Sequence, residues 1–291
     1  MKRWITPVSE ISSWDLLLRL TLIDVLLRPI GPWGIRPLIL VIAASGLIFP
    51  RVLRTPLTWF VLSVLFAARI IADWPMPDNH IYLLAYWCFC LFLALISPYR
   101  DVTLATGSRL LIAFAFLFAV LWKGLLAPDF LDGRFFRVTL LTDERFQDSV
   151  LFLGGLNRDE LKHNREYLTP LPPGAELLTP PKLIEPTAFR RFASISTWGT
   201  LAIEGIIAIL FLIPGEKLYW IRHIMLLLFC VVTYSFAPVA GFGWLLLVMG
   251  MALCCSEHRT LKAIYVTAFF LVLIFAEIPW AGGIAQWIKS S

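Results

Sequence analysis

Two residues of this sequence combine an acid–base side chain with a position in or beside a long apolar segment. Lys123 lies near the end of the segment Leu104–Ala127, and His80 opens the segment His80–Pro98. A lysine buried among apolar walls can give up its proton and act as a general base. An imidazole at the mouth of a helical bundle can act as a base or as a hydrogen-bond donor. Lys123 and His80 are therefore the candidate catalytic residues.

Asn79, Glu204 and Arg69 are the candidate cofactor-binding residues. Asn79 directly precedes His80, while Glu204 lies within an apolar segment. Charges inside a membrane are costly and usually face the interior of a bundle. Each residue also has a structural interpretation. Glu204 can pair with Arg69 or Arg109, Arg69 can extend to the membrane interface as Lys123 can, and Asn79 can cap a helix.

The sequence contains no pattern typical of a metal site or of a common hydrolase. His80 and His223 are the histidines in or beside apolar segments, and neither has further ligands at a recognisable spacing. His223 follows Arg222 at a helix end, where we expect a histidine at the membrane surface. No HExxH, GxSxG, P-loop or paired CxxC motif is present. We therefore predict no metal ion, and metalloprotease, serine-hydrolase and NTPase functions have no support.

The composition places these residues in a membrane protein. The chain has 291 residues, of which 59% are apolar and 15% charged, and its mean hydropathy is +0.78. An ordinary globular protein is about 45–50% apolar and roughly 25% charged. The net charge of +5 forms no basic run, so it indicates membrane topology and not a nucleic-acid partner. We predict an all-α polytopic bundle whose first partner is the lipid bilayer.

Eight apolar segments have, or approach, the roughly 17–25 residues that a helix needs to cross a bilayer. They are Ile35–Pro50, Pro56–Trp74, His80–Pro98, Leu104–Ala127, Trp198–Pro214, Tyr219–Val239, Phe242–Cys255 and Leu261–Trp280. An earlier stretch, Trp14–Pro29, contains Arg19 and Asp24. It is either an amphipathic helix at the interface or a ninth span buried among its neighbours. The prediction is one membrane domain over residues 1–291, with eight or nine transmembrane helices.

A polar segment, residues 128–197, separates the helices of residues 35–127 from the last four, within residues 198–280. It carries nine Lys or Arg and ten Asp or Glu residues, which is typical of a water-facing loop. Within it, Leu140–Leu168 is expected to form one or two short helices, with Asn157–Glu160 as a helix start. The proline-rich stretch that follows, residues 169–187, is expected to be extended or turn-like.

The distribution of basic residues predicts the orientation. Lys and Arg occur on alternate short connections, among them Arg51 and Arg54, Arg100, and Lys217. Cytoplasmic loops carry such an excess. We therefore expect nine spans with the amino end in the cytoplasm, in a bacterial inner membrane or an equivalent one. The segment 128–197 is then extracytoplasmic.

Three stretches carry a family resemblance. They are DNHIYLLAYWCFCLFLAL at Asp78–Leu95, LLIAFAFLFAVLWKGLLAPDFLDG at Leu110–Gly133, and RHIMLLLFCVVTYSFAPVAGFGWLLLVMG at Arg222–Gly250. Together they resemble the membrane domain of the vitamin K-dependent γ-glutamyl carboxylase. The wider bacterial group that shares this domain is called the horizontally transferred transmembrane (HTTM) domain. The resemblance extends over roughly Trp14–Pro279.

The resemblance implies a quinone-dependent reaction. In the family a lysine deprotonates a bound naphthohydroquinone, whose oxygenation produces a strong base. That base removes a γ-proton from a peptide glutamate, and CO2 adds to the carbanion. Asn79 and His80 match the family's Asn-His motif, and Lys123 is the closest counterpart of the lysine base. A reduced quinone, or a bound lipid, is the implied cofactor.

Two main functional hypotheses follow. The first is a non-catalytic accessory subunit of a larger membrane complex, with the segment 128–197 docked on other membrane-protein subunits. The second is an enzyme acting on a quinone or lipid-like substrate, with Lys123 as base. Two differences from the family favour the first: Lys123 lies two residues further from Gly133 than the family's lysine does, and Phe229-Cys230 replaces its Phe-His pair. A transporter would need polar residues in several spans or broken helices in a repeat, and the sequence offers little of either.

Overall fold

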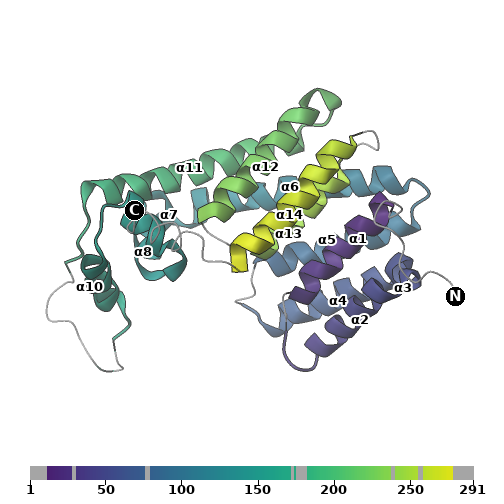
Figure 1. Ribbon diagram of the computed structural model, residues 1–291, viewed down its shortest axis with the longest axis horizontal. Coiled ribbons are helices and arrows are strands. Elements are labelled where there is room, and N and C mark those ends of the chain that lie inside the picture. The colour runs from purple at the N-terminus through teal and green to yellow at the C-terminus, as the bar shows by residue number, and fades with distance from the viewer. Residues whose placement is uncertain are drawn as a thin grey trace, which may run out of the picture.

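The computed structural model describes residues 12–27, 31–75, 79–171, 174, 182–236, 240–254 and 258–277. Within these ranges the chain forms helices and no β-strand, which confirms the predicted all-α class. The molecule is elongated, with a helical bundle at one end and a smaller group of short helices at the other (Figure 1).

Every predicted apolar segment contains a helix. The bundle is made of α1 (Ser13–Leu27), α2 (Arg36–Ile48), α4 (Pro56–Ala72), α5 (Asn79–Ile96), α6 (Arg100–Leu121), α11 (Thr187–Leu212), α12 (Tyr219–Phe236), α13 (Ala240–Ala252) and α14 (Arg259–Glu277), with the short α3 (Pro50–Arg54) between α2 and α4. Prolines set several of these limits. Phe49 and Thr55 are extended because each precedes a proline, and a new helix begins at Pro50 and again at Pro56.

Four helical stretches are long and apolar enough to cross a membrane. They are residues Asn79–Ile96, Arg100–Leu126, Thr187–Leu212 and Glu216–Tyr234. The apolar helices Arg36–Ile48, Pro56–Ala72 and Gly241–Ala252 are shorter. A helix of 13 residues such as α2 is about 20 Å long, less than the roughly 30 Å of a hydrocarbon core. Length and composition thus identify four candidate spans among the eight or nine predicted.

The helix α1 is buried among its neighbours and does not lie on the bundle's surface. It packs against α2, α3 and α13 (Figure 1). Leu18, Leu22 and Val25 are almost inaccessible to solvent. Trp87 of α5 donates its indole N–H to Thr21 Oγ1 at 3.1 Å. The stretch is thus buried within the bundle, and its crossing of the membrane as a ninth span stays a prediction.

The outside of the bundle is apolar. Large side chains are exposed on several helices, including Val41 on α2, Ile71 on α4, Phe118 on α6 and Ile209 on α11. A water-soluble surface rarely carries so many. A surface of this kind is compatible with insertion in a lipid bilayer.

The polar segment forms a folded helical unit. It contains α7 (Pro128–Leu131), α8 (Arg134–Thr142), a 3-10 turn η3 (Glu144–Phe146), α9 (Gln147–Leu153) and α10 (Arg158–Leu168). We call residues 134–171 and 182–193 the appended unit. Its core is separate from that of the bundle and consists of Leu140, Leu141, Phe146, Val150, Leu156, Leu161, Phe189 and Ala193. The amino-terminal turns of α11 supply two of these core residues. For that reason α11 begins at Thr187 and not at Trp198, where the apolar pattern begins.

Local signals inside the appended unit were readable in the sequence. Asn157 accepts a hydrogen bond from the backbone N–H of Glu160, whose carboxylate accepts one from the backbone N–H of Asn157. This capping box confirms the predicted helix start. In the proline-rich stretch, residues 182–186 are irregular, whereas 172–173 and 175–181 lie outside the described residues. Buried Asn164 holds the irregular part, donating to Ile184 O at 2.9 Å and accepting from Ile184 N at 2.8 Å.

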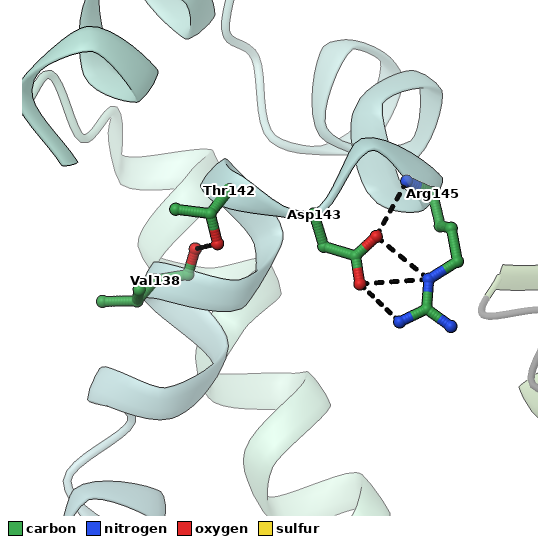
Figure 2. Close-up of polar contacts among 4 residues, drawn as sticks. All are labelled: Val138, Thr142, Asp143 and Arg145. Carbon is green, nitrogen blue, oxygen red and sulfur yellow. Dashed lines mark hydrogen bonds and ion pairs between the residues drawn. The ribbon is translucent and has the colours of Figure 1, made fainter. Parts of the chain in front are cut away.

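Figure 2 shows the corner between α8 and α9. The Asp143 carboxylate accepts hydrogen bonds from the backbone N–H of Arg145 at 3.0 Å and from its guanidinium at 2.5–3.0 Å. Thr142 donates its hydroxyl to Val138 O at 2.9 Å. The guanidinium and the backbone N–H together hold the pKa of Asp143 below its usual range, although partial burial opposes this.

Candidate functional site

The structure brings together two of the predicted site residues, Lys123 and Glu204. The Lys123 ammonium donates to both carboxylate oxygens of Glu204, at 2.5 and 2.6 Å. The Lys123 side chain is 23% exposed and that of Glu204 only 9%. The ring of Phe130, in α7, lies 5.3 Å from Lys123 Nζ, so an aromatic face covers the cation. The pair therefore joins α6 to α11 in a largely buried position.

The local structure around Lys123 is unusual. Residues Trp122–Leu126 form a π-helical turn, η2, that continues α6 as far as Ala127. A wider turn of this kind carries about one extra residue, so it rotates the side chains after it by about 100° relative to a regular helix. Pro128 then starts α7, which folds back and places Phe130 near Lys123.

Glu204 belongs to the buried face of α11. The residues buried along this helix include Thr197, Glu204, Ile207, Ala208 and Phe211. Intervals of three, four and seven residues return to one face of a helix. The sequence thus places this carboxylate towards α6, with which α11 is closely packed. Among the described residues, Lys123 and Glu204 have only each other as side-chain hydrogen-bond partners.

This geometry determines what Lys123 can do. The Lys123 nitrogen is engaged by both oxygens of the Glu204 carboxylate, so in this arrangement it serves as one half of an ion pair within the protein. The two opposite charges also compensate each other in a setting where either alone would be costly. A structural pairing of Glu204 was one of the sequence-based interpretations. The partner is Lys123, however, and not Arg69 or Arg109.

The two arginines proposed as partners of Glu204 have other contacts. Arg69 forms an ion pair with Asp73, one turn further along α4. Arg109 donates to the carbonyl oxygens of Phe211 at 2.8 Å and Leu212 at 3.2 Å. These carbonyls belong to the last turn of α11, where no intrahelical donor is available.

A second arginine, Arg222, also binds carbonyl groups at the carboxyl end of α11. Arg222 donates to Leu210 O at 2.8 Å, to Gly215 O at 3.0 Å and to Ile213 O. Cations near a helix carboxyl end also complement its dipole. This role of Arg222 was not predicted from the sequence. The available signal was Pro214 after an apolar segment, since a proline cannot continue the helix or donate an N–H.

Asn79 and His80 form the first turn of α5 and do not belong to the Lys123–Glu204 pair. Asn79 is exposed and His80 is half-buried. His223 lies in the second turn of α12, near the helix end where it was expected, and its side chain faces the interior of the bundle. It is only 2% exposed, and its Nδ1 lies 2.7 Å from the hydroxyl of Tyr265 on α14. The close packing of α12 against α14 encloses it.

Neither a metal centre nor a thiol site is present in the part of the chain that the structure describes. No group of three or more His, Cys, Asp or Glu side chains there could hold a metal ion. Cys88, Cys90, Cys230 and Cys254 are buried free thiols, which behave as small apolar side chains.

Polar contacts join the beginnings of several helices at one end of the bundle. Arg54, the last residue of α3, forms a two-pronged pair with Asp15 at 2.8 and 2.6 Å. Trp14 donates its indole N–H to Asp101 at 2.7 Å. Lys262 donates to Ser13 Oγ at 3.2 Å. The starts of α1, α6 and α14 therefore lie together, beside the start of α4.

No protein-family model, curated protein or solved structure matches this chain.

Proposed function

We propose that this protein is a non-catalytic accessory subunit of a larger membrane complex, built on a carboxylase-like helical bundle. The observation that carries the proposal is the closed ion pair of Lys123 and Glu204. Both carboxylate oxygens hold the ammonium, and Phe130 covers it. The residue that would act as base thus serves to connect α6 with α11.

The arrangement of the helices supports a nine-span topology for this subunit. The starts of α1, α6 and α14 meet at the end of the bundle that carries Arg54 and Lys262. Such basic clusters favour the cytoplasm. The Lys123–Glu204 pair lies at the other end of α6, next to the appended unit. In this proposal the membrane is a bacterial inner membrane or an equivalent one, and the appended unit is extracytoplasmic.

The appended unit offers a surface for a partner protein. It has its own apolar core, so it can keep its shape outside the bilayer. On α9, Phe152 is 82% exposed and its neighbour Leu153 is 41% exposed. Adjacent exposed apolar side chains on a water-facing unit are typical of a protein contact. We propose that this patch docks onto another subunit of the complex.

One observation favours the enzyme as a second candidate. Lys123 lies in a π-helical turn, and such turns occur frequently at functional sites. In that function the Lys123 ammonium would first transfer a proton to the Glu204 carboxylate, and the neutral Lys123 amine would then take a proton from a quinone or lipid-like substrate.

Affinity purification in a mild detergent from the native membrane tests the proposal. The wild-type protein is expected to co-purify with at least one other membrane protein at a fixed stoichiometry. Phe152→Ser should reduce that recovery at least tenfold. Lys162→Ser, at a side chain that is 78% exposed on α10, is the matched control and should leave the recovery unchanged. A protein that purifies alone from its native membrane would contradict the subunit function.

A further inference from the structure

A cavity of about 220 Å³ lies where the appended unit meets the bundle. One wall is the turn between α7 and α8, formed by Leu131, Asp132 and Gly133, together with Arg137 of α8. Gly133 has a φ of 77°, a left-handed conformation that glycine adopts without strain and that lets the chain turn sharply here. The other wall is α11.

The α11 wall presents its side chains in a defined order. Arg190, Ser194 and Trp198 line the cavity at intervals of four residues, so they follow one another along a single face of the helix. Arg190 and Trp198 are about 12 Å apart along the axis at 1.5 Å per residue. The order is a cation, then a hydroxyl, then an indole.

This order of side chains is the one expected where a helix enters a membrane, with the cation on the aqueous side and the indole at the interface. Trp198 is 57% exposed, and the apolar run of α11 follows it directly. Tryptophan is enriched at the level of the lipid headgroups. Because α11 is long and apolar enough to cross a membrane, Trp198 lies at the interface and Arg190 on its aqueous side.

The charges around the cavity favour an anion. Arg190 has no ion-pair partner among the described residues, whereas Arg137 forms an ion pair with Glu185 at 3.6 Å. The acidic group on the lining, Asp132, is bound by the side chain of Arg134 at 2.7 Å and by its backbone N–H at 2.9 Å. The Arg190 guanidinium and the Ser194 hydroxyl therefore stay available to a ligand, and Arg137 adds a second guanidinium whose charge Glu185 partly offsets. One arginine guanidinium can donate two parallel hydrogen bonds to two oxygens of a phosphate group.

We propose that this cavity binds the phosphate group of an anionic phospholipid, with the phosphate between Arg137 and Arg190 and the acyl chains passing Trp198 into the bilayer. The cavity is smaller than the roughly 300–1,000 Å³ of a pocket for a whole small-molecule ligand. It therefore suits a headgroup whose tails stay outside. The bound lipid would tie the appended unit to the membrane surface. The inference needs only that α11 crosses the bilayer, and it holds for a subunit and for an enzyme alike.

Native mass spectrometry of the full chain in detergent tests the proposal, with graded additions of phosphatidylglycerol, of phosphatidylcholine or of inorganic phosphate. We expect one phosphatidylglycerol to be retained with high affinity. Phosphatidylcholine carries the same phosphate but also a cationic choline group, which the arginines repel, so it should bind at least tenfold more weakly. Arg190→Gln should weaken phosphatidylglycerol binding at least tenfold. Arg191→Gln, at the next exposed residue of α11 and outside the cavity lining, should leave the binding unchanged.

A second variant separates the cavity from general surface charge. Ser194→Trp keeps every arginine but fills the space, and it should also abolish tight phosphatidylglycerol binding. Equal weakening by Arg190→Gln and Arg191→Gln would overturn the proposal. Inorganic phosphate bound in an Arg190-dependent way, without retention of the lipid, would overturn the lipid as ligand. None of these results depends on a partner protein, so they are independent of the test of the accessory function.

Discussion

The Lys123–Glu204 pair makes a quantitative prediction about stability. Lys123→Met keeps the length and packing of the side chain but leaves the Glu204 carboxylate buried, with only 9% of that side chain exposed. Removing one partner of a buried ion pair costs about 3–5 kcal/mol. Because the Lys123 side chain is 23% exposed, we expect the lower end, about 3 kcal/mol. For a chain of 291 residues, with an unfolding entropy of about 2.1 cal/mol/K per residue, that corresponds to a fall of about 5 °C in the unfolding midpoint.

Removing both charges should restore most of the loss. Replacing a buried pair with apolar residues of similar volume is often neutral, so Lys123→Met with Glu204→Leu should unfold within about 1.5 kcal/mol of the wild type, as volume-conserving core changes do. The assay is thermal unfolding in a mild detergent, followed by the fluorescence of the 12 tryptophans.

The exposed pair of Lys162 and Glu166 supplies the control for this assay. Their charged atoms are 3.9 Å apart and their side chains are 78% and 64% exposed. Lys162→Met should therefore change stability by less than about 0.5 kcal/mol. If the double variant is as unstable as Lys123→Met, or if Lys123→Met is as stable as the wild type, the ion pair does not hold the bundle together as we infer.

Three further predictions concern other contacts. Asn164→Leu removes both hydrogen bonds to the Ile184 backbone and leaves buried polar groups without partners. It should therefore lower the free energy of unfolding by about 2–4 kcal/mol. Faster amide hydrogen exchange at Ile184, with unchanged exchange in α12, would show that the loss is local. Arg145 lowers the pKa of Asp143, so this carboxylate stabilises the fold fully above its unfolded pKa of about 3.9 and loses that effect as the pH falls through the lower folded value. The unfolding midpoints of wild type and Asp143→Asn should accordingly differ at pH 7, and the difference should shrink progressively as the pH falls below about 3.9; a constant difference would show that the charge is irrelevant. A Cβ at Gly107 of α6 would lie 2.2 Å from Cys90 Sγ of α5, so Gly107→Ala should destabilise the fold by about 1–3 kcal/mol. Adding Cys90→Ala should restore the stability of this variant. A Gly107→Ala chain as stable as the wild type would refute this close packing.

Much of the fold could be predicted from the sequence, because apolar runs and prolines are local signals. The runs located the long helices of the bundle but not the short α3, and Pro50 and Pro56 separate consecutive helices. The capping box at Asn157 and Glu160 was readable for the same reason, since its partners are three residues apart. The crossing of the membrane by eight or nine of these helices stays a prediction, since four of the helical stretches meet the length and composition of a span.

The candidate site could not be predicted in full from the sequence, because it is formed by contacts between segments that lie far apart in the chain. Lys123 and Glu204 were each recognised as unusual, but nothing local shows that α6 and α11 lie side by side, so the partner of Glu204 was predicted wrongly. The second apolar core was missed because its members, such as Leu140 and Phe189, are spread over short amphipathic helices and the start of α11. The burial of His223 could not be predicted because Tyr265, which contacts it, lies on another helix.

The most direct test of the accessory function uses the double variant Lys123→Met with Glu204→Leu in the native membrane. The protein is purified in a mild detergent, its partners are quantified by mass spectrometry, and its unfolding midpoint is measured with and without a naphthohydroquinone. We predict that the variant recovers the same partner at the same stoichiometry as the wild type, and that the hydroquinone shifts neither midpoint. A wild-type protein that purifies alone and is stabilised by the hydroquinone, with that stabilisation lost in the variant, would contradict the proposal and establish Lys123 as part of a quinone site.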